Sequence, residues 1–194
     1  YGYAEVGTGT GGPGDGTGND IIVNGSVSST ASPVISTTGT LGALSTTYGT
    51  ASSETSFNVS GADMAAGILV TPPSGYEVSL ASGSGYATTV TVGSSGTIAS
   101  TPVYVRLTST ATVAGSPYSG NIVLSSSGAT AVNVATVSST VSAKALTITG
   151  IAANNKLFDG NTDATLSGTA SLVGIVNSDV VTLGGTPVAT FASS

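Results

Sequence analysis

Three oxygen-bearing side chains near the C-terminus have a spacing that suits a metal ion. Asp159, Asn161 and Asp163 alternate with other residues in a D-x-N-x-D pattern. On a loop, such side chains can converge on one calcium ion, which prefers several oxygen ligands. The EF-hand pattern fails, because Ala164 stands where glycine is needed and Ala170 where the bidentate glutamate belongs. The same residues also fit a turn in which their side chains cap backbone amides, and we favour that interpretation.

A second group of oxygen ligands lies in a glycine-rich stretch near the N-terminus. Residues 7–18 read GTGTGGPGDGTG, and Asp15 is followed by Asn19 and Asp20. So much glycine has too much backbone freedom for a packed element, which predicts a flexible loop or linker. Calcium bound by these three side chains is the alternative, although their spacing matches no known calcium motif.

The composition excludes most catalytic chemistry. The chain has no His, no Cys and no Trp, so it lacks the residues for a Ser-His-Asp or Cys-His site, a disulfide or a zinc site. Glu54, Asp63 and Glu77 are scattered acids, and no pair of them has the flanking aromatic residues that would line a sugar-cleaving cleft. We therefore expect no catalytic residue and no enzymatic activity, and calcium is the only cofactor that the sequence suggests.

The elements that would position these residues are short β-strands. In residues 103–107, Val103, Val105 and Leu107 alternate with polar or larger residues, which places three apolar side chains on one face of a strand. Short strands at regular spacing with turn residues between them are typical of an antiparallel, immunoglobulin-like β-sandwich. A single helical turn is expected over 62–66. The expected strands are 34–37, 55–60, 67–71, 76–80, 88–92, 103–107, 121–125 and 132–141.

The apolar residues of these strands predict the core, and one tyrosine has a predicted structural role. Tyr118 follows a Gly-Ser-Pro turn and precedes a strand. In immunoglobulin-like domains a tyrosine at this corner bonds its hydroxyl back to the upstream backbone; a sugar-stacking surface is the alternative. The predicted core is Leu41, Phe57, Val59, Ile68, Val70, Val78, Leu80, Val90, Val92, Val103, Val105, Leu107, Ile122, Leu124, Val132 and Val134.

Charge and composition limit the partners. Nine acidic residues against three basic residues give a net charge of -6, and three scattered cations cannot form the basic patch that nucleic acid or an anionic membrane requires. The sequence contains no apolar run long enough for a transmembrane helix. It opens without the features of a signal peptide, so we take it as a processed or partial piece of a longer protein.

The sequence divides into three parts. Residues 1–32 hold strand-like segments and a Gly/Ser-rich linker, which we interpret as the end of a preceding domain; residues 33–143 form the sandwich, and residues 144–194 begin a second β-rich domain. In that last part, 156–166 (KLFDGNTDATL), 167–170 (SGTA) and 174–180 (GIVNSDV) resemble the bacterial YDG repeat, with Phe158 in place of the usual tyrosine. The preceding unit, with its stretches 39–79, 103–107 (VYVRL) and 118–129 (YSGNIVLSSSGA), is similar to the immunoglobulin-like repeats found beside YDG repeats. The second domain is expected to be incomplete.

The resemblance implies an extracellular setting, secreted or on the bacterial cell surface, because such repeats occur in tandem in large secreted adhesins. The function expected from it is a structural stalk or fibre element, with neighbouring repeats or copies of the chain meeting through sheet edges. A carbohydrate-binding accessory module of a secreted enzyme is the alternative, with surface glycans as partners. The absence of Trp disfavours it, because such modules stack aromatic side chains on sugar rings.

Overall fold

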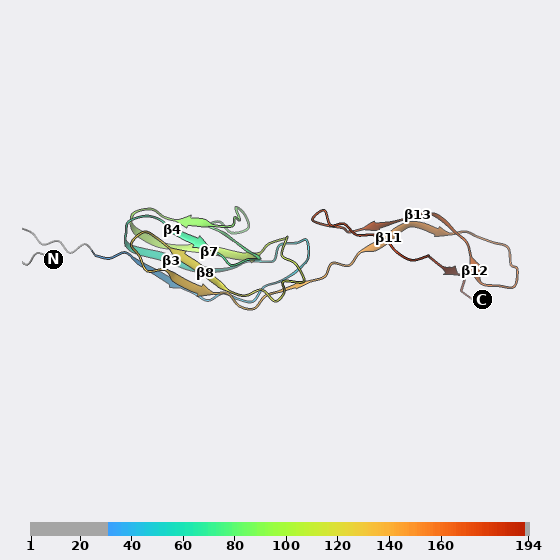
Figure 1. Cartoon of the computed structure of the whole chain (residues 1–194), viewed down its shortest axis with the longest axis horizontal. Helices are drawn as coiled ribbons and strands as arrows, with labels where there is room; N and C mark the ends of the chain where they lie inside the picture. The colour runs from blue at the N-terminus through green and yellow to red at the C-terminus, as the bar shows by residue number, and fades with distance from the viewer. Residues whose placement is uncertain (1–30, 193–194) are drawn as a thin grey trace, which may run out of the picture. The chain divides into compact units, whose positions relative to one another are not determined.

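The structure, a computed structural model, describes residues 31–192 and is all-β (Figure 1). Within this range there is no helix, so the predicted fold class is confirmed and the helical turn expected over 62–66 is wrong. The strand-like segments expected near the N-terminus, at 1–6 and 21–23, lie outside the described residues, as do the proposed ligands Asp15, Asn19 and Asp20.

Residues 34–142 form two four-stranded antiparallel sheets and one short parallel pair. The first sheet has the order β1-β3-β7-β5, with β1 (Val34–Thr38), β3 (Thr55–Met64), β7 (Gly96–Leu107) and β5 (Tyr76–Ser79). The second has the order β6-β4-β8-β9, with β6 (Val90–Val92), β4 (Ile68–Thr71), β8 (Asn121–Ser125) and β9 (Val132–Ala135). The parallel pair joins β2 (Ser45–Thr47) to β10 (Thr140–Ser142).

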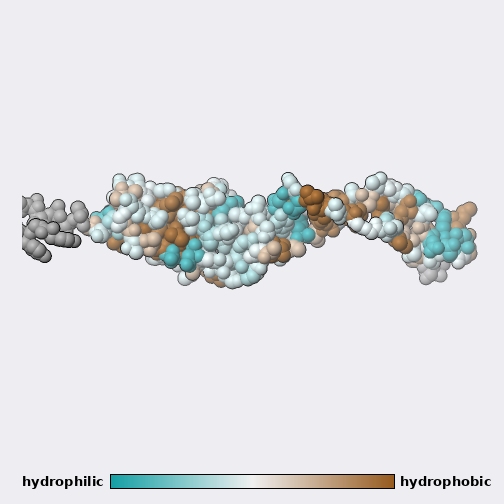
Figure 2. All heavy atoms as spheres, viewed as in Figure 1, coloured by the Kyte–Doolittle hydropathy of each residue, from teal (hydrophilic) through white to brown (hydrophobic). Residues whose placement is uncertain are grey.

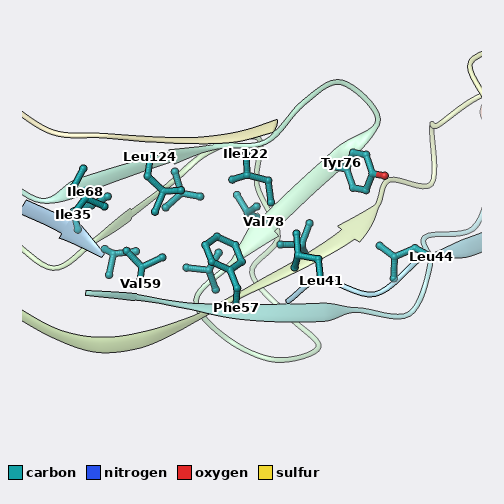
Figure 3. Packing of buried hydrophobic residues seen from close by; sticks show 14 of the residues in the cluster. Ile35, Leu41, Leu44, Phe57, Val59, Ile68, Tyr76, Val78, Ile122 and Leu124 are labelled. Carbon is teal, nitrogen blue, oxygen red and sulfur yellow. The ribbon is translucent and has the colours of Figure 1, made fainter. Parts of the chain in front are cut away.

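The core lies between these two sheets (Figure 3). Alternation along each strand directs every second side chain inward, so Phe57 and Val59 of β3 face Ile122 and Leu124 of β8, and all four are at most 2% exposed. Burying a side chain of this size stabilises the fold by about 1.5–3 kcal/mol relative to leaving it in water. Two facing sheets with alternating inward residues make a β-sandwich.

Three of the predicted strands differ from the structure by more than two residues. β7 begins at Gly96, seven residues before the predicted start, and the segment predicted as one strand over 132–141 is two strands, β9 and β10, in different sheets. β3 continues to Met64 through two register shifts, and Asp63 has φ 53° there. These bulges absorb extra residues and bend the strand, which brings Met64 into the core at 3% exposure.

The predicted core is largely right, with one clear error. Leu80 is 41% exposed, because β5 ends at Ser79 and the chain turns away from the sheet. Val90, Val132 and Val134 are partly buried against the core. The core residues that the prediction missed are Ile35, Leu44, Met64, Tyr76, Ile98, Ala111 and Val141.

The remaining strands follow the sandwich in the chain and form two small sheets. β11 (Thr147–Ala153) pairs with β13 (Leu166–Val173), and β12 (Asp163–Ala164) pairs with β14 (Ala189–Thr190), both antiparallel. The β11–β13 ladder has a register shift after Thr149, where Gly150 (φ +85°) lies against the partner strand. A Cβ there would fall 2.2 Å from the carbonyl oxygen of Thr169, so only glycine fits this close approach.

Candidate functional site

Asp159 and Asn161 lie on the loop between β11 and β12, Asp163 is the first residue of β12, and Lys156 lies on the same loop. Lys156 Nζ donates hydrogen bonds to Asp159 Oδ1 at 2.7 Å and to Asn161 Oδ1 at 2.5 Å. The backbone N–H of Asn161 donates to Asp159 Oδ1 at 3.2 Å, and its side-chain amide donates to Asp159 Oδ2 at 3.2 Å. The loop oxygens therefore converge on the ammonium group of Lys156.

Asp163 enters this network through its backbone. Its N–H donates to Asn161 Oδ1 at 3.0 Å, which is the amide capping that a turn requires. The Lys156 hydrogen bond, followed by the Asn161 amide, holds the pKa of the Asp159 carboxyl below its ordinary value. In the part of the chain that the structure describes, no three His, Cys, Asp or Glu side chains are grouped to hold a metal ion.

Sequence reasoning missed Lys156 as a member of this site. The signal was present, because Lys156 and Asp159 are three residues apart and carry opposite charges. A cavity of about 500 Å³ adjoins the loop, and Phe158, Thr162 and Phe191 are among the residues that line it. The Phe158 side chain is 96% exposed, so this hollow presents an aromatic ring to solvent beside a polar turn.

Tyr118 lies at the corner before β8, and both its hydroxyl and its ring contact other residues. Its hydroxyl accepts a hydrogen bond from the Thr112 N–H at 2.7 Å and donates to the Thr112 carbonyl oxygen at 3.1 Å. Its ring meets Tyr76 edge to face, with centroids 6.4 Å apart, and a Cβ on Gly75 or Gly115 would collide with Tyr118. The ring and hydroxyl are thus engaged by the protein itself.

A shallow cavity of about 460 Å³ adjoins this corner. Pro72 and Pro73 contribute to its wall, together with the hydroxyl-bearing residues Thr108 and Thr110 and the Tyr118 ring. No charged side chain lines it. This lining suits an uncharged polar ligand, and the tyrosine that would stack on such a ligand is packed against two glycines.

The structure reveals a second polar cluster, on the sandwich, that sequence reasoning did not find. Glu54 accepts hydrogen bonds from the Ser82 hydroxyl at 2.5 Å, the Gly83 N–H at 3.0 Å and the Tyr86 hydroxyl. The Arg106 guanidinium lies 3.7 Å above the centre of the Tyr86 ring and pairs with Glu77 at 2.7 Å. These residues are distant in sequence, so only the fold could reveal the cluster.

The contacts of this cluster hold its own members in place, and we call the cluster the clamp. Its members are Glu54, Glu77, Ser82, Gly83, Tyr86 and Arg106. The three donors lower the pKa of Glu54, and burial, together with the Glu54 hydrogen bond, raises the pKa of Tyr86 to about 12. Both groups thus stay in the protonation states that the hydrogen bonds need: an ionised acceptor and a protonated donor. The cluster fastens the loop after β5 to the outer face of the first sheet and leaves Glu54 without a free role as an acid or base.

Comparison with known proteins gives one match. No curated protein and no solved structure shows a significant match to this chain. The described part of the chain contains no helix long and apolar enough to span a membrane. Residues 142–194, which include the Lys156 loop and strands β11 to β14, match the YDG domain family.

Proposed function

We propose that this chain is a non-enzymatic segment of an extracellular bacterial surface or adhesin-like protein, in which it acts as a structural stalk or fibre element. The observation that carries the proposal is the YDG match over residues 142–194, directly after a β-sandwich. In this proposal the sandwich is an immunoglobulin-like repeat. Its two four-stranded antiparallel sheets and the Tyr118 corner support that assignment.

The polar groups support a structural role. Glu54, Glu77 and Arg106 are three of the four charged residues in 33–143, and all three are engaged in the clamp on the first sheet. Around Lys156 the carboxylate of Asp159 is likewise engaged. An enzyme needs a reactive group that is free to meet a substrate, and these clusters satisfy their own members instead.

Partners in this proposal are neighbouring repeats or copies of the chain, which meet through sheet edges. β1 and β9 are edge strands, and neither carries a charged side chain. Charged residues on an edge strand are a common protection against pairing with another chain. At the opposite edge of the first sheet, Ala87 already bridges to Val78 of β5, so among the described residues the β1 edge is the more open one.

Negative-stain electron microscopy at low and high protein concentration tests how the segment is used. Fibres of constant width would mean that subunits join their sheets, and discrete particles at all concentrations would mean a spacer. If fibres form, Val34→Lys on the 52% exposed start of β1 should abolish them, whereas Val113→Lys, at a 43% exposed position outside the strands, should leave them intact. Fibres that survive Val34→Lys would exclude pairing through β1.

The alternative function is a carbohydrate-binding accessory module. The cavity beside Tyr118, with its proline and threonine lining, is the observation that favours it. A glycan array decides between the two: binding that is lost in Thr110→Val would establish the module and overturn the structural proposal. No binding at high protein concentration would remove the alternative.

A further inference from the structure

A loop in the C-terminal part of the chain, residues 174–179, lies back against the sandwich. β10 ends at Ser142 and β11 begins at Thr147, so only four residues connect them. The antiparallel register pairs Thr147 with Val173, and therefore β13 ends where β11 begins. The loop over residues 174–179 must emerge beside the exit of the sandwich.

Two hydrogen bonds join this loop to the sandwich. The Tyr48 hydroxyl donates to Asp179 Oδ1 at 3.0 Å. The side-chain amide of Asn177 donates to the carbonyl oxygen of Ser109 at 3.1 Å. These contacts engage two separate segments of the sandwich, the turn after β2 and the loop after β7.

An apolar contact lies beside the two hydrogen bonds. Val176 packs against Gly49, where an added Cβ would fall 2.5 Å from Val176 Cγ2. Gly49 also has φ +87°, a conformation that favours glycine. The missing side chain at position 49 thus makes room for the valine of the loop.

The loop has a backbone shape that presents these side chains together. The N–H of Asp179 donates to the carbonyl oxygen of Val176 at 3.0 Å, which closes a turn. Asn177 and Ser178 have φ of 52° and 59°, in the left-handed region that asparagine tolerates better than most residues. Such a turn brings a valine, an amide and a carboxylate close together along the chain.

We propose that the surface formed by Tyr48, Gly49 and the Ser109 carbonyl is a docking site for the turn at residues 174–179, and that this docking fixes the β11–β13 hairpin to the sandwich. The site fits a tight turn with a small apolar side chain, an amide and a carboxylate in the order Val-Asn-x-Asp. The proposal is independent of the stalk function, since a glycan-binding module would use the same junction.

Spin labels can test the docking, because the chain has no cysteine of its own. Ser100→Cys on β7 and Thr169→Cys on β13 are both exposed positions for labels, one on each side of the junction. Pulsed electron resonance of the full chain should give one narrow distance distribution. A broad distribution in this parent would overturn the proposal.

Substitutions in the loop test whether its contacts cause the narrow distance distribution of the parent. In Val176→Ala/Asn177→Gly, the glycine retains access to positive φ while the packing and the amide are removed; the distribution should widen at least two-fold. Tyr48→Phe should widen it by a smaller factor, and Tyr104→Phe, a tyrosine on β7 away from the loop, should leave it unchanged. An unchanged width in the double variant, with the sandwich unfolding at the same urea concentration as the parent, would also overturn the proposal.

Discussion

The sandwich and the C-terminal strands use the same backbone pairing, yet they bury very different amounts of side chain. Both contain antiparallel ladders with alternating residues. The sandwich encloses a cluster of 19 buried hydrophobic residues, whereas no residue from 142 to 192 is buried. Phe57 is 2% exposed and Phe158 is 96% exposed. A ladder forms strands, but only a second layer facing it makes a core.

Apolar side chains of the C-terminal strands consequently remain at the surface. Ile148 on β11 and Val173 on β13 are 53% and 49% exposed, and Figure 2 shows hydrophobic patches over this part of the molecule. An isolated two-stranded hairpin is only marginally stable in water. The C-terminal strands therefore depend on neighbouring structure in a way that the sandwich does not.

The largest expected difference between the two regions comes from truncating one phenylalanine in each. Phe57→Ala should lower the free energy of unfolding of the sandwich by about 3–5 kcal/mol, because it removes a fully buried ring and leaves a cavity. Phe158→Ala should change it by less than about 0.5 kcal/mol, as is usual for surface substitutions. Urea unfolding of both variants measures this, and equal losses would contradict the comparison.

Amide hydrogen exchange should distinguish the sandwich from the C-terminal strands in the unmodified protein. Amides of β3 and β7 lie beside the core and should exchange only on global unfolding, whereas those of β11 and β13 should exchange through local opening at lower free energy. Mass spectrometry of peptides from each strand, over seconds to hours, measures the two rates. Equal protection would mean that the hairpin and the sandwich unfold as one unit.

Tyrosine substitutions should give a smaller effect. Tyr118→Phe removes the hydroxyl that serves both backbone groups of Thr112, and it should cost about 0.5–1.5 kcal/mol, the usual net contribution of a hydrogen bond. Tyr104→Phe is the matched control, since the hydroxyl of Tyr104 has no hydrogen bond among the described residues. Thermal unfolding of the two variants side by side should show a lower midpoint for Tyr118→Phe alone.

The smallest effects concern pH, and they have opposite signs in the two regions. Tyr86 of the sandwich has a pKa of about 12, above its ordinary value of 10, so its stabilising contribution is complete below pH 10 and is lost as the pH rises toward 12. The pKa of Asp159 is lowered, so its contribution is present at neutral pH and is lost in acid as the pH falls through that lowered value.

Ultraviolet absorbance at alkaline pH should show that Tyr86 ionises above the ordinary tyrosine pKa of 10, and Glu54→Gln should bring the pKa of Tyr86 down. NMR titration should show the Asp159 pKa rising toward its ordinary value in Lys156→Gln. A pKa of Asp159 that is the same with and without Lys156 would mean that the lysine contact does not persist in solution.

The sequence was informative wherever local alternation decided the structure. Val103, Val105 and Leu107 predicted the inward face of β7, and all three are fully buried. The first half of β7 lacks this alternation and contains Pro102, which argues against a strand. In the structure, Pro102 pairs with Asn58 of β3 beyond the part of β7 that β5 covers, and proline is tolerated at such edge positions.

The two polar clusters also differ in how far the sequence could predict them. The turn around Asp159 and Asn161 could be predicted, because its members are neighbours in the chain, and Lys156 was within reach of the same reasoning. The contact between Glu54 and Tyr86 spans 32 residues. No local pattern contains such a contact; it exists only because β3, β5 and β7 lie side by side in one sheet.

The parallel pairing of β2 with β10 has a mechanical consequence. β10 is the last strand before the chain leaves the sandwich, and its three residues run alongside β2. Tension applied to the chain beyond Ser142 pulls β10 along its own axis. The hydrogen bonds between β2 and β10 are then loaded at the same time, rather than broken one after another. This shear geometry lets a short strand bear load at the point where the chain leaves the sandwich.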